Sequence, residues 1–315
     1  MTSLAEKAPR RTASRSSAAA RQRTRAALLL MAPFFVLFLL VTILPVFYAF
    51  GLSLFQEKSS GLGFGGSGPQ TVFAGFDNYV QVMSDPIYWA GYLHTLVYAV
   101  IAVPVVLVGG IVIALLLDSV YARAKRAFQL GLFIPHLVPG VIAALIWLYL
   151  YTPQISPIVK MLAGVDIHVN LFGAEWTYPT VVNITLWEAL GYNIVIYYAS
   201  LQAISRDVLE AATIDGAGEL RTAWSIKLPL IGSSVGLTAL FAAIGAMQLF
   251  AEPLLLATGG STNVTQTWTP NLYVYTEAFT KTNYGLAAAG SIILAVIAGG
   301  LSFALTRYAK PGVDR

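Results

Sequence analysis

The chain has 315 residues, of which 57% are hydrophobic and only 11% charged, and its mean hydropathy is +0.70. A soluble domain has about 25% charged residues, so this composition indicates an integral membrane protein. The absence of Cys excludes disulfide scaffolds, thiolate metal sites and cysteine nucleophiles, and three separated His residues leave little for a metal cluster. The formal net charge is +4, but the basic residues are scattered between apolar stretches and do not predict a nucleic-acid-binding face.

Six stretches are long and apolar enough to cross a bilayer as helices, which requires about 20 residues. Five of them have no Asp, Glu, Lys or Arg, and the fourth in chain order is interrupted only by Glu188. We therefore predict an all-α integral membrane protein with six transmembrane helices, over residues 26–55, 86–117, 127–159, 178–201, 228–251 and 282–306.

The distribution of basic residues predicts the orientation of these spans. Of the 19 Lys and Arg residues, 16 lie in the two terminal tails and in the second and fourth connections. Because cytoplasmic segments retain the basic excess, both termini are expected in the cytoplasm. Residues 1–25 are expected to form a disordered basic tail, which either sets the topology or contacts anionic lipid. Residues 26–307 then form one six-helix membrane domain, and residues 308–315 form a short cytoplasmic tail.

The connection between the fourth and fifth spans, residues 202–227, has more internal order than a simple linker. Asp207 and Glu210 have the spacing of a helix N-cap and its capping-box partner, and Gly216 suits the left-handed position that ends a helix. A second amphipathic segment should follow and end at Pro229. The pattern predicts a helix, a tight turn and a second helix, which form either a compact docking element or an interfacial linker with solvated charges.

The same connection carries a pattern that fixes seven positions across twenty residues: Glu210-Ala211-Ala212, Gly216, Ile226 and Leu228-Pro229. This pattern resembles the EAA loop of permease subunits of binding-protein-dependent ABC importers. Other segments are similar to the carbohydrate branch of that family, which includes the maltose and glycerol-phosphate permeases. They include Phe73-Ala-Gly-Phe-Asp-Asn-Tyr79, Leu132-Phe-Ile-Pro135 and Thr258-Gly-Gly260.

The resemblance implies the type I ABC importer permease fold, in the cytoplasmic membrane of a prokaryote, and a translocation subunit rather than an enzyme. In that family the EAA loop presents a coupling helix to a cytoplasmic ATPase dimer, so the implied coupling residues are Glu210, Ala211, Ala212, Asp215, Gly216 and Ala217. The chain lacks a G-x-x-x-x-G-K-[ST] motif, so ATP is expected to be used by that partner, with no cofactor or metal on this chain. The other implied partners are a second permease subunit and an extracytoplasmic solute-binding protein.

Polar residues at membrane depth are costly and usually functional, so they predict the substrate path. Glu188 lies near the middle of the fourth span, with Tyr192 on the same helix face and Trp187 as an aromatic neighbour for a sugar ring. Gln248 and Glu252 have i, i+4 spacing on the fifth span. The alternative is that Glu188 pairs with a neighbouring helix and that Glu252 lies at the wet interface.

The sequence favours one function and leaves others open. No Lys or Arg lies in any predicted span, which favours import of a neutral sugar or oligosaccharide over glycerol phosphate or another polar metabolite. A self-contained secondary transporter is a further alternative, but it has no need of an EAA loop. Gly65-Gly-Ser-Gly68 has the G-x-S-G form of intramembrane serine proteases, yet it lies in a polar external tract, so a protease is not predicted.

Overall fold

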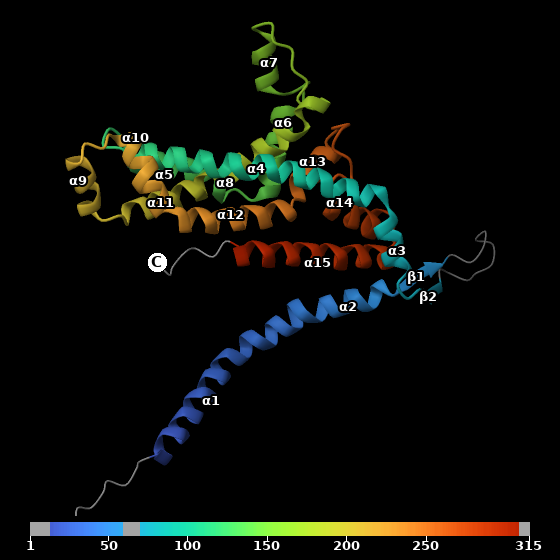
Figure 1. Cartoon of the computed structure of the whole chain (residues 1–315). Coiled ribbons are helices and arrows are strands. Elements are labelled where there is room, and N and C mark those ends of the chain that lie inside the picture. Colours follow the sequence, from blue (N-terminus) through green and yellow to red (C-terminus); the bar gives the residue numbers. More distant parts are fainter. Residues whose placement is uncertain (1–12, 59–69, 309–315) are drawn as a thin grey trace, which may run out of the picture. The chain divides into compact units, whose positions relative to one another are not determined.

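The computed structural model describes residues 13–58 and 70–308, and it is mostly helical (Figure 1). The chain divides into two compact units, residues 1–52 and 53–315. The first unit contains α1 (Ala13–Phe38), the π-helical turn η1 (Leu39–Ile43) and most of α2 (Leu44–Ser53). Within it, the helix from Thr24 onward is long and apolar enough to cross a membrane.

The N-terminal segment differs from the prediction of a tail without structure over residues 1–25. Residues 1–12 lie outside the described residues, but α1 already begins at Ala13. Residues 13–27 are rich in Ala and Arg, which favour helix. They also extend an existing apolar helix, so their own helix formation needs no separate nucleation step.

The second unit begins with a short antiparallel hairpin of β1 (Phe55–Lys58) and β2 (Gln70–Phe73), in which Phe55 lies opposite Phe73. The predicted glycine tract with Ser67 falls outside the described residues. The elements that follow are α3 (Asp77–Ser84), α4 (Pro86–Asp118), α5 (Lys125–Phe133), η2 (Ile134–Leu137), α6 (Gly140–Tyr151), α7 (Pro157–Ala163), η3 (Ala174–Trp176), α8 (Thr177–Gln202), α9 (Arg206–Ile214), α10 (Glu219–Thr222), η4 (Ala223–Lys227), α11 (Leu228–Leu230), α12 (Gly232–Met247), α13 (Ala251–Thr258), α14 (Pro270–Tyr275), η5 (Thr276–Thr280) and α15 (Tyr284–Tyr308).

The helices α4, α8 and α12 pack side by side, and α15 packs on α12, α14 and α3 (Figure 1). One buried cluster includes Tyr98 on α4 and Ile184 on α8, and another joins Ala114 to Tyr197. Close approach of α4 and α8 depends on Gly110, where a Cβ atom would lie 3.0 Å from side-chain carbons of Asn193 and Tyr197. The two long helices therefore form a closely packed pair.

The predicted spans are observed in part. Within residues 13–58 and 70–308, four segments are long and apolar enough to cross a membrane, over Thr24–Ser53, Pro86–Asp118, Gly232–Thr258 and Tyr284–Arg307. The helix α8 has 26 residues and is long enough to span, but it is less apolar because it carries Glu188 and several amide and hydroxyl groups. The prediction of one continuous span over residues 127–159 is wrong, because α5–η2 and α6 are bent by 96° and α6 ends at Tyr151.

Proline causes this bend. Pro139 cannot donate a backbone hydrogen bond and disfavours helical geometry in the residue before it. Val138 is accordingly extended, with φ −77° and ψ 126°. Pro135 stands in the short 3-10 turn η2 that ends α5. A pattern of uncharged residues gives the length of such a segment but not its direction, so the sequence prediction missed the bend.

The start of α4 is joined to the last long connection by Asp85. One carboxylate oxygen accepts from the backbone N–H of Ile87 at 2.9 Å and caps α4, and the other accepts from the Tyr273 hydroxyl at 2.7 Å. Burial raises the pKa of Tyr273 above its ordinary value, and its hydrogen bond to Asp85 raises it further. The phenol therefore remains a protonated donor, which holds α14 against α4.

We expect Gly191→Ala to destabilise the helical bundle. A Cβ atom at Gly191 would overlap the carbonyl oxygen of Leu132 and lie 2.8 Å from the Cα of Phe133. Since backbone atoms cannot rotate away, the overlap should cost about 1–3 kcal/mol, measured as a lower thermal unfolding midpoint of the purified protein. Gly131→Ala is the control, because nothing lies within 4 Å of its added Cβ. Equal midpoints for the two variants would contradict the close approach.

Candidate functional site

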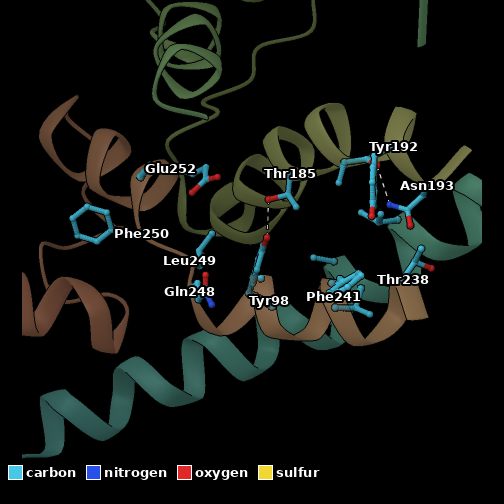
Figure 2. Close-up of a pocket in the computed structure, with 18 residues that line it drawn as sticks. Tyr98, Thr185, Tyr192, Asn193, Thr238, Phe241, Gln248, Leu249, Phe250 and Glu252 are labelled. Atoms are coloured by element: carbon cyan, nitrogen blue, oxygen red, sulfur yellow. Dashed lines mark hydrogen bonds between the residues drawn. The ribbon is translucent and has the colours of Figure 1, made fainter. Parts of the chain in front are cut away.

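A cavity of about 440 Å³ lies between α4, α8, α12 and the start of α13 (Figure 2). Its lining is mostly apolar, but it includes polar side chains of Tyr98, Thr185, Tyr192, Gln248 and Glu252. Among residues 13–58 and 70–308, no Lys or Arg contributes to the lining. Ligand sites are commonly cavities of about 300–1,000 Å³ with a few well-placed polar groups, so this cavity can hold a small polar molecule.

Hydroxyl and amide groups connect the walls of the cavity. The hydroxyls of Tyr98 and Thr185 are 2.7 Å apart and join α4 to α8. The Tyr197 hydroxyl lies 2.5 Å from the Thr238 hydroxyl, which joins α8 to α12, and it also contacts Asn193 Oδ1 at 3.3 Å. These groups are neutral and can both donate and accept. The helices around the cavity are therefore joined by polar contacts that use no formal charge.

Gln248 and Glu252 reach the cavity from a break in the predicted fifth span. The prediction that they lie one turn apart on one helix is wrong, because α12 ends at Met247 and α13 starts three residues after Gln248. The Asn271 amide donates to the carbonyl oxygens of Met247 at 3.0 Å and Leu249 at 3.3 Å. These carbonyls lie where the helix is interrupted and have lost their helical partners. Asn271, which lies on α14, therefore stabilises the break between α12 and α13.

The structure places Glu188 and Trp187 on α8 but outside the lining of this cavity. The Glu188 carboxylate faces the bend before α6, where a Cβ on Gly140 would lie 3.5 Å from Oε1. Trp187 packs edge to face on Trp147, with ring centroids 6.1 Å apart. Glu188 Oε1 and Trp147 Nε1 are buried and have no hydrogen-bond partner among the described residues. The alternative prediction, a side-chain pair for Glu188, is therefore not observed in the described part of the chain.

The polar lining residues that the sequence analysis missed include Tyr98, Asn193 and Thr238. Each is a neutral polar residue in a predicted span. The rule that selected Glu188 considered the cost of burying a charge. These three residues are neutral, and they form hydrogen bonds with Thr185, with Tyr197 or with the helix backbone. Polar residues at equivalent depths on neighbouring spans would have been the signal to use.

The first helix of the connection between α8 and α12 is α9. The predicted N-cap at Asp207 is wrong, because Ser205 is the cap and its hydroxyl accepts from the Asp207 N–H at 3.3 Å. Asp207 instead lies in the first turn, where a negative charge favours the helix. The predicted stop at Gly216 is confirmed, since its φ is +75°. The Gly216 and Ala217 amides donate back to Thr213 and Ala212, as in a Schellman motif.

The six implied coupling residues are arranged around the end of α9. Ala212 is buried and Ala217 is half-buried, whereas the other four are exposed: Glu210, Ala211, Asp215 and Gly216. The end of α9 therefore presents a small, acidic surface with a sharp turn. Its neighbour Ile214 is 86% exposed, which adds an apolar side chain that a partner can cover.

The second segment does not end at Pro229 as predicted but continues to Leu230. The π-helical turn η4 precedes the proline, and the Leu228 N–H donates to Ala223 O, five residues back. The turn η1 lies in the same way before Leu44 and Pro45. A π turn changes which carbonyl each amide reaches, so the helix tolerates a proline that has no N–H to give.

A comparison with protein-family models identifies the family of this chain. The model described as "Binding-protein-dependent transport system inner membrane component" matches residues 88–314. The chain belongs to this family. It is thus a membrane-embedded permease component of an ABC transport system, and the resemblance inferred from the EAA loop and its neighbouring motifs is confirmed.

Individual relatives agree with this assignment. The permease is 30% identical to the sulfoquinovosyl glycerol transport system permease protein SmoG of Agrobacterium fabrum strain C58, over 89% of this chain and 87% of that protein. It is 28% identical to the sn-glycerol-3-phosphate transport system permease protein UgpA of Yersinia pestis strain Antiqua, over 77% and 82%. A solved chain of a bacterial ABC transporter involved in the import of alginate matches with a TM-score of 0.78 at 20% identity, over 93% and 98%. The last likeness confirms the helical permease fold.

We expect loss of the Asn271 amide to destabilise the permease. In Asn271→Ala the carbonyls of Met247 and Leu249 lose their donor, which should cost about 1–3 kcal/mol and lower the thermal unfolding midpoint in detergent. Asn271→Asp has nearly the same shape but no donor, so it should lose as much stability. If Asn271→Asp behaves like the unmodified permease, packing rather than the hydrogen bonds holds the break.

Proposed function

We propose that the permease forms half of the pore of a sugar or oligosaccharide importer. The observation that carries this proposal is the cavity between α4, α8, α12 and α13, whose polar lining consists of hydroxyl, amide and carboxylate groups without a cation among the described residues. Such groups donate to and accept from sugar hydroxyls. The relative SmoG, whose name specifies a sulfoquinovosyl glycerol, supports a glycoside as the substrate class. Because that glycoside carries a sulfonate, SmoG does not bear on the charge of the substrate.

Glycerol phosphate is the second candidate substrate, because UgpA is a relative of similar length. A phosphate group is best bound by Arg, Lys or a helix N-terminus. The cavity instead carries Glu252, and a carboxylate disfavours an anion at close range. We therefore place the neutral saccharide first, and the proposed substrate path consists of Tyr192, Gln248 and Glu252, with Glu188 and Trp187 on the adjoining face of α8.

The proposed topology has six spans with both termini in the cytoplasm. The four apolar segments, the bent pair α5–α6 and the long helix α8 supply the six, and the basic residues concentrate at the cytoplasmic ends. In this arrangement residues 26–307 are the membrane domain, and the flanking tails are cytoplasmic. The N-terminal tail contributes seven basic residues that attract anionic lipid.

The proposed coupling element is the end of α9, where Glu210, Ala211, Ala212, Asp215, Gly216 and Ala217 surround the glycine turn. We infer that it docks in a partner ATPase, which hydrolyses ATP, while this chain binds no cofactor. A second permease subunit completes the pore, and an extracytoplasmic binding protein delivers the substrate. Exposure of Glu210 and the positive φ of Gly216 support this role, because they shape a small projecting turn.

We expect Glu210→Lys to reduce the amount of ATPase that co-purifies with the tagged permease, because the substitution reverses the charge of an exposed contact. Mass spectrometry of the gently extracted complex measures the ATPase, the second permease and the binding protein. Glu175→Lys, an exposed acid in another connection, is the control. An ATPase that is absent even from the unmodified complex, together with ion-driven uptake, would favour a secondary transporter instead.

We expect Gln248→Ala and Glu252→Gln to lower sugar uptake while the ATPase still co-purifies. Each removes a hydrogen-bonding group from the cavity, and one such group commonly contributes about 0.5–1.5 kcal/mol, or about twofold to twelvefold in affinity. Uptake into vesicles with a radiolabelled saccharide and with glycerol phosphate measures the effect and separates the two substrates. Thr258→Ala, outside the cavity lining, is the control. Unchanged uptake in both cavity variants would contradict the proposed path.

A further inference from the structure

Asp118, the last residue of α4, lies at a junction of three elements. Its Oδ2 atom accepts from Lys227 Nζ at 2.5 Å, and its Oδ1 atom accepts from the Gln202 amide at 2.6 Å. Lys227 ends the π turn η4, and Gln202 ends α8. The Lys227 and Asp118 side chains are only 18% and 10% exposed, so water is largely excluded from the ion pair. The Asp118 carboxylate therefore joins the C-terminal ends of α4 and α8 to η4, in the segment between α8 and α12.

Helix stability does not explain this carboxylate. The C-terminal end of a helix carries a partial negative charge, so an Asp there is unfavourable without a nearby cation. Burial of an ion pair also contributes little net stability, because desolvation offsets the attraction. The position of Asp118 instead depends on Lys227, which lies 109 residues later in the chain.

Apolar packing joins the connection to α4 through Leu228, which lies against the buried cluster that contains Ala114, but the packing is incomplete beside this contact. A groove of about 440 Å³ lies along the C-terminal half of α4 and the segment α10–η4, and its lining includes Val112, Leu116, Leu220 and Trp224. The other polar contact across this region, from Ser119 to Glu219, is long at 3.4 Å. The two hydrogen bonds of Asp118 are therefore the short polar contacts that join η4 and the end of α8 to the C-terminal end of α4.

The same two helices form the walls of the transport cavity. Tyr98 lies 20 residues before Asp118 on α4, about 30 Å away along a helix with 1.5 Å rise per residue. Gly110 lets α4 pack closely on Asn193 and Tyr197 of α8 between these points, so displacement of one helix end is carried to the other helix. A movement at Lys227 thus has a direct route to the cavity.

We propose that Asp118 is a positioning residue for transport, which transmits displacement of the α9–η4 segment to α4 and α8 through Lys227 and Gln202. This inference rests on the proposed function, in which the end of α9 docks in the ATPase. The ion pair should then be dispensable for docking but necessary for substrate-dependent control of ATP hydrolysis.

The test uses the complete complex of both permeases, ATPase and binding protein in lipid vesicles. Asp118→Asn and Lys227→Gln should each lower saccharide uptake and binding-protein-stimulated ATPase activity about tenfold, with unchanged ATPase co-purification and basal activity. If the two residues act as one unit, the double variant should lose no more than either single variant. Arg123→Gln is the matched control, because it removes an exposed charge from the neighbouring connection.

Normal uptake in the single variants would overturn the proposal, as would losses that multiply in the double variant. If the single variants do not assemble, the double variant Asp118→Lys with Lys227→Asp, which exchanges the two charges, distinguishes transmission from a structural role. Recovery of both assembly and uptake supports transmission through the pair; recovery of assembly alone, or failure of every variant to assemble, shows a structural role and contradicts it. Failure of the proposed function is distinct, because the unmodified complex would then contain no ATPase.

Discussion

Inside a hydrocarbon layer, a backbone amide or carbonyl without a hydrogen bond is too costly to persist, so each irregular helix segment must be compensated within the protein. The break between α12 and α13 meets this constraint through the Asn271 amide. The turns η1 and η4 meet it with longer-range helical bonds next to a proline. The cavity depends on the same compensation, because the break is what aims Gln248 and Glu252 away from a regular helix face.

The charged residues and the neutral polar residues occupy different parts of the described structure. Apart from Glu252, the polar groups that line the cavity are neutral hydroxyls and amides, which can exchange protein contacts for those of a hydroxylated ligand. Formal charges gather instead at helix ends and connections, as in the pair of Asp118 and Lys227 and the cap formed by Asp85. Such a division keeps the strong, directional contacts at the ends of the bundle and the adaptable contacts in the middle.

The sequence predicts those features that depend on neighbours along the chain. The length of each apolar stretch locates the long helices. Gly216 marks the end of α9 because this end depends only on the local backbone conformation, a positive φ. Prediction from the sequence fails where a residue far along the chain determines the local structure. Asn271 allows the break at Gln248, the prolines turn α6 away from α5, and polar partners on other helices make Tyr98 and Thr238 part of the cavity. The EAA pattern identified the family because its spacing is local, whereas the cavity is built from four helices.

The 24-residue separation between Met247 and Asn271 also bears on how the chain is made. Synthesis proceeds from the N-terminus, so residues 232–258 are complete before Asn271 exists to satisfy the carbonyls of the break. The fifth span must therefore first enter the bilayer as a continuous helix or with its break still hydrated. Its final shape, and with it the cavity, is completed only when α14 has been synthesised and docks.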